Sequence, residues 1–115
     1  MEEKKRSYFY ALEIIKFIDL LDKKGFISQT IARQLLRSAA SVGANIVEAQ
    51  AGSSKKDFTN YFSHSIKSAN ESLFWLNLLK DSQKVEAGPV EKLIQETKEI
   101  SSILGASILT LRGKK

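Results

Sequence analysis

Residues 28–52, SQTIARQLLRSAASVGANIVEAQAG, decide the fold class. Apolar residues recur along this stretch at mostly three- and four-residue steps, which is the period of an α-helix that buries one face. Ser28 is a favoured N-terminal cap and Gly52 ends the pattern, so we expect one long helix here. The recurring residues are Ile31, Leu35, Val42, Ile46 and Ala49.

A second face of the same helix carries small residues. Small side chains allow another helix to approach closely. A glycine in a helix interior is destabilising by about 1 kcal/mol relative to alanine, so close packing at Gly43 is the simplest compensation. The small residues are Ala39, Ala40, Ser41, Gly43 and Ala44.

Three further segments show the helical period, and none alternates with the period of a strand. Ser54 and Asp57 resemble a capping box, and Pro89 suits a first helical turn. Short connections favour antiparallel neighbours, so we predict an all-α, antiparallel up-down-up-down four-helix bundle, one domain over residues 1–115. The expected helices span residues 7–23, 28–52, 54–82 and 89–112.

Two segments are apolar around most of their circumference. In residues 7–23 the polar side chains form one narrow stripe, and in SLFWLNLL, residues 72–79, Phe74 and Trp75 accompany four leucines. A single core-facing side does not account for so wide an apolar surface, and a monomer would expose a large patch. We expect the surplus surface to contact another subunit.

Residues suited to catalysis or metal binding are few. The sequence holds no cysteine, one histidine (His64) and no glycine-rich phosphate loop, which excludes disulfides, thiolate sites and multi-histidine metal sites. Bundle di-metal sites use repeated Glu-x-x-His pairs, which are absent. We therefore expect no enzyme and no cofactor, and an ordinary surface or interface role for His64. The carboxylates considered for such a site are Glu13, Asp19, Glu48 and Glu71.

Several polar residues lie in apolar surroundings. Four of them, spaced 4, 4 and 3 residues apart, share one side of the helix over residues 28–52. A buried charge requires a counter-charge, so the set predicts a polar network that fixes helix register or a subunit interface. The alternative is a plain solvated face; three flanking alanines favour the network. Its members are Arg37, Ser41, Asn45, Glu48 and, on the following helix, Glu71.

The composition, 43% hydrophobic and 27% charged with a net charge of +5, is that of a folded basic protein. In the predicted topology both termini and the second connection meet at one end, where basic residues attract phosphates. Flexible solvated tails are the alternative. No stacking aromatic pattern accompanies these lysines, so base-specific reading is not expected. The basic residues are Lys4, Lys5, Arg6, Lys55, Lys56, Arg112, Lys114 and Lys115, opposed by Glu2, Glu3 and Asp57.

The basic start and following apolar run superficially suggest a secretion signal. However, Glu13, Lys16 and Asp19 interrupt the run at helical spacing, and no small-residue cleavage site follows. No stretch reaches the roughly 18 uninterrupted apolar residues of a membrane span. We expect a cytoplasmic protein that does not contact membranes.

Three blocks of the sequence are distinctive when taken together: QLLRSAASVGANIVEA, a SKKDF helix start, and SANESLFWLNLLKD. They resemble the bacterial 23S rRNA intervening-sequence family, which includes the accessory proteins of diversity-generating retroelements. The likeness extends to the final ILTL segment, while Val47 and Ala49 depart from the family's usual small residue and glycine. The most specific residues are Gln34, Leu35, Arg37, Ser41, Asn45, Ile46 and Glu48, joined by the block from Glu71 to Leu79.

The resemblance implies an antiparallel four-helix bundle, a ring of five subunits and no known catalytic activity. For retroelement accessory members it also implies contact with RNA and with a reverse transcriptase. The leading hypothesis is therefore a non-enzymatic homo-oligomeric bundle that binds structured RNA through its basic end. The alternative is a protein–protein scaffold without affinity for nucleic acid.

Overall fold

The computed structural model describes residues 2–22, 24–52, 54–82 and 84–113. These ranges form four α-helices and contain no strand, which confirms the all-α class. The helices are α1 (Glu2–Leu20), α2 (Phe26–Ala51), α3 (Lys55–Asp81) and α4 (Ala87–Gly113).

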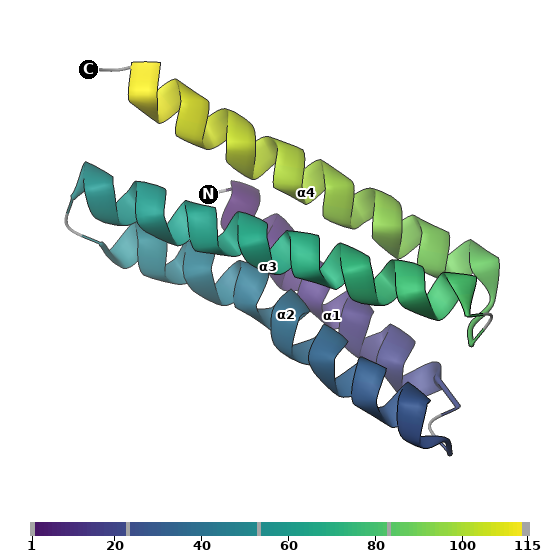
Figure 1. Cartoon of the computed structure of the whole chain (residues 1–115). Coiled ribbons are helices and arrows are strands. Elements are labelled where there is room, and N and C mark those ends of the chain that lie inside the picture. Colours follow the sequence, from purple (N-terminus) through teal and green to yellow (C-terminus); the bar gives the residue numbers. More distant parts are fainter. Residues whose placement is uncertain (1, 23, 53, 83, 114–115) are drawn as a thin grey trace.

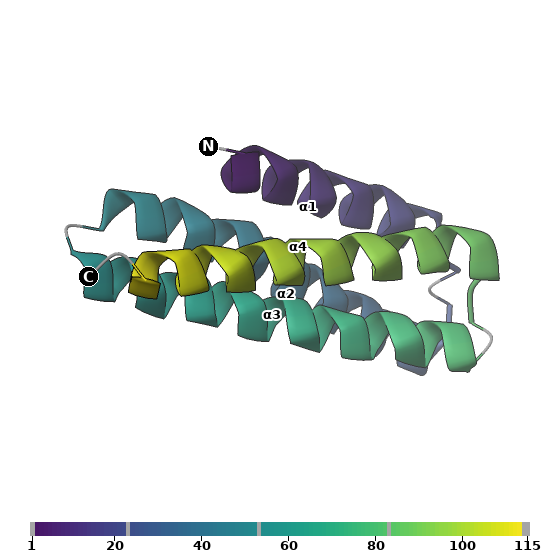
Figure 2. The ribbon, with the colours of Figure 1, turned by 90° about the horizontal axis from the view of Figure 1, so that it is seen from above.

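Successive helices run in opposite directions and lie side by side in an elongated bundle of 51 × 20 × 19 Å (Figure 1). α2 packs on α3 and α3 packs on α4, while α1 packs on both α2 and α4 and so closes the ring of four helices (Figure 2). This is the predicted up-down-up-down bundle. Within the described ranges, no helix is long and apolar enough to cross a membrane.

α1 is the shortest helix, with 19 residues against 26 or 27 in the others. It starts well short of the α2–α3 connection (Figures 1 and 2). Three of the described helices therefore build the end of the bundle that holds this connection and the C-terminal end of α4. The first residues of α1 lie along the side of the bundle rather than at its tip.

Two helix starts differ from the prediction. α1 begins at Glu2 rather than at residue 7, and acidic side chains in its first turn suit the positive end of the helix dipole. The cap of α2 is Gly25, whereas Ser28 is buried within the first turn. The prediction of Ser28 as N-cap was wrong because the helical pattern continues one turn upstream, through Phe26.

The starts of α3 and α4 follow the expected signals. The Ser54 hydroxyl accepts a hydrogen bond from the backbone N–H of Asp57 at 3.0 Å, which satisfies one of the unpaired donors at the start of α3. Pro89 lies in the first turn of α4, where its missing N–H removes no helical hydrogen bond.

The core combines aliphatic side chains from all four helices with two aromatic anchors. Tyr10 and Phe62 are almost fully buried, and the Phe62 ring stacks on Phe58 with centroids 4.2 Å apart. Burying a side chain of this size typically contributes about 1.5–3 kcal/mol. The other large, fully buried hydrophobic side chains are Ile14, Leu35, Ile46, Leu76, Leu79, Leu104, Val42 and Val90.

A layer of buried hydroxyl groups crosses the middle of the bundle. The Tyr10 hydroxyl of α1 lies 2.6 Å from Thr97 Oγ1 of α4, and Ser38 Oγ of α2 lies 2.8 Å from Ser72 Oγ of α3. Burial raises the pKa of Tyr10 above its ordinary value, because the phenolate would lose its hydration. Thr97 and Ser72 both act to lower the pKa of Tyr10, but burial has the larger effect.

At Gly43, α1 comes close to α2. A Cβ atom at this position would lie 3.3 Å from Ser7 Oγ and 3.6 Å from Ser7 Cβ. Ser7 is 1% exposed, and its hydroxyl donates to the Lys4 carbonyl of its own helix at 3.0 Å. The helix expected to pack on the small residues of α2 is therefore α1.

Candidate functional site

The predicted basic residues divide into two groups along the bundle. Lys4 and Lys5 of α1 are exposed on the side of the molecule, and Lys55 and Lys56 are exposed at the start of α3. Arg112 is exposed near the end of α4. The remaining two predicted residues, Lys114 and Lys115, lie outside the described residues.

Arg6 differs from the rest of the predicted basic set. Its Nε and Nη2 atoms donate to the two carboxylate oxygens of Glu96 at 2.8 Å each, and Nη2 also donates to Glu99 at 2.6 Å. Hydrogen bonds that Arg6 donates to Glu96 and then to Glu99 raise the pKa of Arg6, and hydrogen bonds donated by Gln95 and then by Arg6 lower the pKa of Glu99. Arg6 thus ties α1 to α4, and its guanidinium is already engaged by protein carboxylates.

The predicted polar network begins with an ion pair across the α2–α3 seam. Arg37 Nη2 donates to Glu71 Oε2, and the same oxygen accepts from Trp75 Nε1 at 3.0 Å. Gln34 Oε1 accepts from Arg37 Nε at 3.2 Å and orients the guanidinium from its own helix. The Arg37 side chain is 58% exposed and that of Glu71 is 36% exposed, so the pair borders solvent in the single chain.

A second cluster of polar contacts continues the seam one turn further along α2. Asn45 Nδ2 donates to both the carbonyl and the hydroxyl of Ser41 at 2.9 Å, and Ser68 of α3 donates to the Ser41 hydroxyl at 2.9 Å. The Glu48 side chain is exposed and has no hydrogen-bond or ion-pair partner among the described residues. The seam therefore brings together four of the five predicted residues and leaves Glu48 at its edge.

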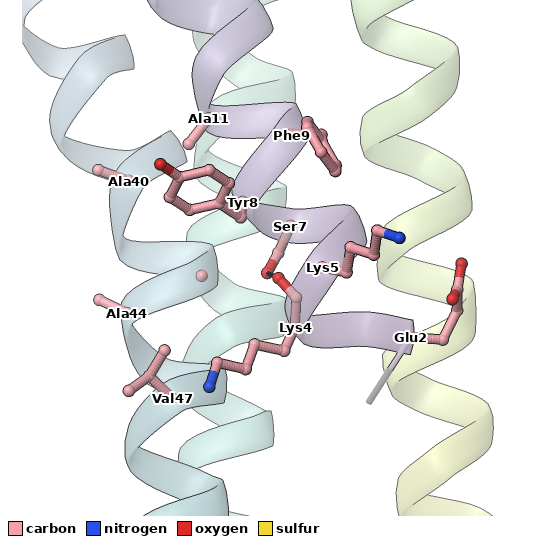
Figure 3. Close-up of a pocket in the computed structure, with 11 residues that line it drawn as sticks. Glu2, Lys4, Lys5, Ser7, Tyr8, Phe9, Ala11, Ala40, Ala44 and Val47 are labelled. Atoms are coloured by element: carbon pink, nitrogen blue, oxygen red, sulfur yellow. Dashed lines mark hydrogen bonds between the residues drawn. The ribbon is translucent and has the colours of Figure 1, made fainter.

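An apolar groove of about 670 Å³ lies where the N-terminal half of α1 crosses α2 (Figure 3). On α2 it is lined by Val47 and by three of the predicted small residues, Ala40, Gly43 and Ala44. The α1 side is formed mainly by Lys4, Ser7, Tyr8 and Ala11, and Glu2, Lys5 and Phe9 complete the lining. The Lys4 side chain extends along α2 toward Val47 in Figure 3.

Large apolar side chains at and beside this groove face solvent in the single chain. Tyr8 is 64% exposed, Phe9 is 53% exposed and Val47 is 46% exposed. Ile15 continues the α1 stripe two turns after Tyr8, and Leu36 continues the α2 stripe one turn before Ala40. The wide apolar surface expected on the first helix is therefore present, and it is shared with α2.

The metal site considered from the sequence has no support among the described residues. Within these ranges, no three His, Cys, Asp or Glu side chains lie close enough together to hold a metal ion. His64 is exposed on α3. Two of the carboxylates considered for a site have basic partners instead, since Glu13 accepts from Lys16 at 3.5 Å and Glu71 from Arg37.

Comparisons with known proteins agree with this architecture. Residues 1–106 match the family described as 23S rRNA-intervening sequence protein. The chain is also similar to a crystal structure from Bacteroides thetaiotaomicron, a protein of unknown function from the S23 ribosomal protein family. The two are 32% identical, with a TM-score of 0.85 over 92% of this chain and 97% of the other. Among curated proteins, none matches the chain.

Proposed function

This chain belongs to the family of 23S rRNA-intervening sequence proteins, and we propose that it is a homo-oligomeric bundle that binds structured RNA. In this proposal the protein works by binding rather than by catalysis. Exposed cations contact the phosphate backbone, and an apolar face on α1 and α2 joins one copy to the next. The family name refers to an rRNA, which makes RNA the first ligand to test.

The main support for RNA binding is a set of exposed cations that have no ion-pair partner among the described residues. Lys4, Lys5, Lys56 and Arg112 are exposed and have no ion-pair partner among the described residues. The neighbouring Glu3 accepts a hydrogen bond from Ser107 at 2.9 Å, which directs its carboxylate toward α4. Cations without internal partners release counterions when they meet phosphates, and this release dominates the affinity of most nucleic-acid-binding proteins.

The groove between α1 and α2 supports self-association. Its lining combines small α2 residues with the exposed Tyr8 and Phe9 rings, which is the shape that admits a helix from a neighbouring molecule. Exposed apolar surfaces of this kind in a soluble protein typically mark an interaction site. The polar seam at Arg37 and Glu71 lies on the other flank of α2 and supplies charged groups that can fix the orientation of two copies.

RNA binding is tested by fluorescence anisotropy of a labelled structured RNA at low and at physiological salt. We expect saturable binding whose affinity falls steeply with salt. Replacing Lys4, Lys5, Lys55 and Lys56 together by glutamine should abolish most of it, because each lost phosphate contact removes a share of the counterion release. The matched control neutralises Lys16, Lys24, Lys92 and Lys98, which are also exposed. Absence of binding at low salt refutes the RNA-binding function.

Self-association is tested by light scattering of one groove variant and one control variant. Ala44→Arg places a charge in the groove, whereas Ala106→Arg places the same charge on exposed α4 surface. We expect only Ala44→Arg to lower the mass. Replacing Asn45 or Glu48 by leucine should likewise disturb assembly before it changes helix content. An unchanged mass for both leucine variants contradicts a role of these residues in assembly.

A protein–protein scaffold is the second candidate, because the groove is apolar and suits a partner helix. The two functions differ in their response to salt. Phosphate-driven affinity falls with ionic strength, whereas apolar docking is far less sensitive. A partner captured equally well at low and high salt, together with no RNA binding, favours the scaffold.

A further inference from the structure

The outer face of α3 carries a line of polar and basic side chains that ends in an aromatic ring. Lys56, Asn60, His64 and Lys67 follow one another at steps of 4, 4 and 3 residues, and all four are exposed. Phe74 lies two turns beyond Lys67 and is 58% exposed. Residues at these spacings share one side of a helix, so the five residues form one continuous surface, hereafter the outer face of α3.

None of the five residues of this surface is acidic. Asp57, beside Lys56 in the first turn of α3, is half-buried, and its backbone N–H donates to the Ser54 hydroxyl. Glu71 accepts from both Arg37 and Trp75. Lys56 and Lys67 have no ion-pair partner among the described residues, and they stand about 16 Å apart along the helix. The line is therefore positive over three turns.

Phe74 is an unusual residue to find exposed at the end of such a line. Its ring packs edge-on against Trp75, with centroids 5.0 Å apart and an angle of 76° between the ring planes. Trp75 is in turn fixed by its hydrogen bond to Glu71. The exposed ring is thus held in a defined orientation about 10 Å from Lys67 along the helix. Sequence reasoning assigned Phe74 to an apolar patch and did not connect it with the lysines.

We propose that the outer face of α3 binds a single-stranded segment of RNA, with Lys56 and Lys67 on phosphates and an unpaired base stacked on Phe74. This inference rests on the proposed RNA-binding function and deepens it. A positive track with an aromatic platform is how proteins hold single strands without sequence preference. A duplex keeps its bases stacked inside and offers none to Phe74.

Asn60 and His64 favour RNA over DNA as the strand. Each of these side chains can both donate and accept hydrogen bonds, with His64 doing so in its neutral form. The 2′-hydroxyl of ribose is also both donor and acceptor, and it distinguishes RNA from DNA. Both residues lie between the two lysines, where the sugars of a strand running along the helix would pass.

The stacking contact is tested by anisotropy of a labelled, unstructured RNA oligonucleotide, with the matching duplex and the single-stranded DNA as comparisons. We expect the single-stranded RNA to bind most tightly. Phe74→Leu should weaken it by about 5- to 150-fold, the range for loss of one base-stacking contact. Phe74→Tyr should bind like the unmodified protein. The matched control is Leu109→Ala, which alters a side chain that is 69% exposed on α4.

The phosphate contacts are tested by the salt dependence of the same binding. Lys67→Gln should reduce the slope of log affinity against log salt by about 0.7, the value for one phosphate contact on a single strand. Lys16→Gln, which removes an equal charge from the outer side of α1, should leave the slope unchanged. Trp75 is the only tryptophan of the chain, so base stacking on Phe74 should also change its fluorescence when unlabelled RNA is added.

The outcomes separate this inference from the proposed function. Binding of structured RNA that is unaffected by Phe74→Leu and Lys67→Gln overturns the inference and leaves the proposed function standing. A lower mass of Phe74→Leu in light scattering also overturns the inference, since Phe74 is then a subunit contact. No binding of any RNA overturns both.

Discussion

The buried hydroxyl layer and the α2–α3 seam are both polar, yet they stabilise the molecule in different ways. The layer consists of two hydroxyl pairs, Tyr10–Thr97 between α1 and α4 and Ser38–Ser72 between α2 and α3, and all four side chains are at most 2% exposed. The seam joins only two helices, and its Arg37–Glu71 pair borders solvent. Hydrogen bonds that replace water inside a core must be satisfied, whereas a solvated ion pair adds little. The layer fixes the relative positions of the helices, whereas the paired charges of the seam remain in contact with solvent.

Each serine or threonine of the layer has a second acceptor on its own helix. Ser38 Oγ reaches the Leu35 carbonyl at 3.2 Å, and Thr97 Oγ1 donates to the Leu93 carbonyl at 2.6 Å. No buried side-chain nitrogen or oxygen of the described residues is left without a partner. The layer therefore tolerates loss of one hydroxyl better than loss of the Tyr10 ring.

The largest expected effect comes from removing that ring. Tyr10→Ala should lower the free energy of unfolding by about 3–5 kcal/mol, because it leaves a cavity among packed side chains. Urea denaturation followed by circular dichroism measures this loss. Tyr8→Ala is the control, since Tyr8 is 64% exposed in the single chain, and it should change stability by about 0.5 kcal/mol or less. Equal losses would mean that Tyr8 is covered in the assembled protein.

Removing only the hydroxyl of Tyr10 should have a smaller effect on the free energy of unfolding, and this effect should depend on pH in a defined direction. Tyr10→Phe should cost about 1 kcal/mol at neutral pH, the net value of one hydrogen bond. The pKa of Tyr10 is raised by burial above its ordinary value of 10.0. The stability due to the buried neutral phenol is therefore fully present below pH 10 and is lost as the pH rises through the folded-state pKa.

Tyrosinate absorbance and alkaline unfolding, measured together, check the direction of this pH dependence. The unmodified protein should lose stability above pH 10 more steeply than Tyr10→Phe, and the variant should lack the last tyrosinate step. If the two proteins have the same alkaline profile, the phenol does not titrate as a buried group.

The sequence predicted the helix count, the antiparallel order and the small-residue crossing, because hydrophobic period and short connections determine them locally. It did not predict the hydroxyl layer. Serine and threonine occur on both surfaces and cores, and a single Ser72 carries no signal of which helix it will meet. Polar and charged residues in an apolar context gave a stronger signal, and four of the five make side-chain contacts along the seam.

The sequence alone does not show whether the predicted basic residues lie together at one end of the bundle, because this depends on the three-dimensional arrangement of the helices. Lys55 and Lys56 lie beside the α2–α3 connection because they begin α3, but the sequence gives no indication of how far α1 extends. Arg6 meets Glu96 and Glu99 across a separation of 90 or more residues. Such distant pairings depend on the register of α1 against α4, which helical period alone does not set.

The seam should contribute much less to folding than Tyr10 does. We expect a double-mutant cycle with Arg37→Met and Glu71→Gln to give a coupling energy of about 1 kcal/mol or less, because both side chains are partly solvated. Denaturation of the two single variants and the double variant measures it. A coupling of several kcal/mol would show that the pair is desolvated in the assembled protein, and the contrast with the hydroxyl layer would disappear.

The smallest expected effect is at the buried Ser7, where packing can be measured separately from hydrogen bonding. Its hydroxyl is satisfied within α1, and it contributes to the α1–α2 crossing only by its volume beside Gly43. Gly43→Ala should leave stability nearly unchanged. Higher helix propensity favours alanine by about 1 kcal/mol, and crowding of the new Cβ against Ser7 Oγ at 3.3 Å opposes it.

The double variant Ser7→Ala/Gly43→Ala removes the crowding oxygen and leaves Ser7 Cβ, at 3.6 Å, in ordinary contact. It should therefore be more stable than Ser7→Ala alone by about 0.5–1 kcal/mol. Thermal and urea unfolding of the four proteins in this cycle measure the difference. If Gly43→Ala destabilises the unmodified protein and the Ser7→Ala variant equally, the backbone of α1, and not the Ser7 hydroxyl, limits how closely α1 approaches α2. The two helices are then closer together than the volume of the Ser7 side chain alone requires.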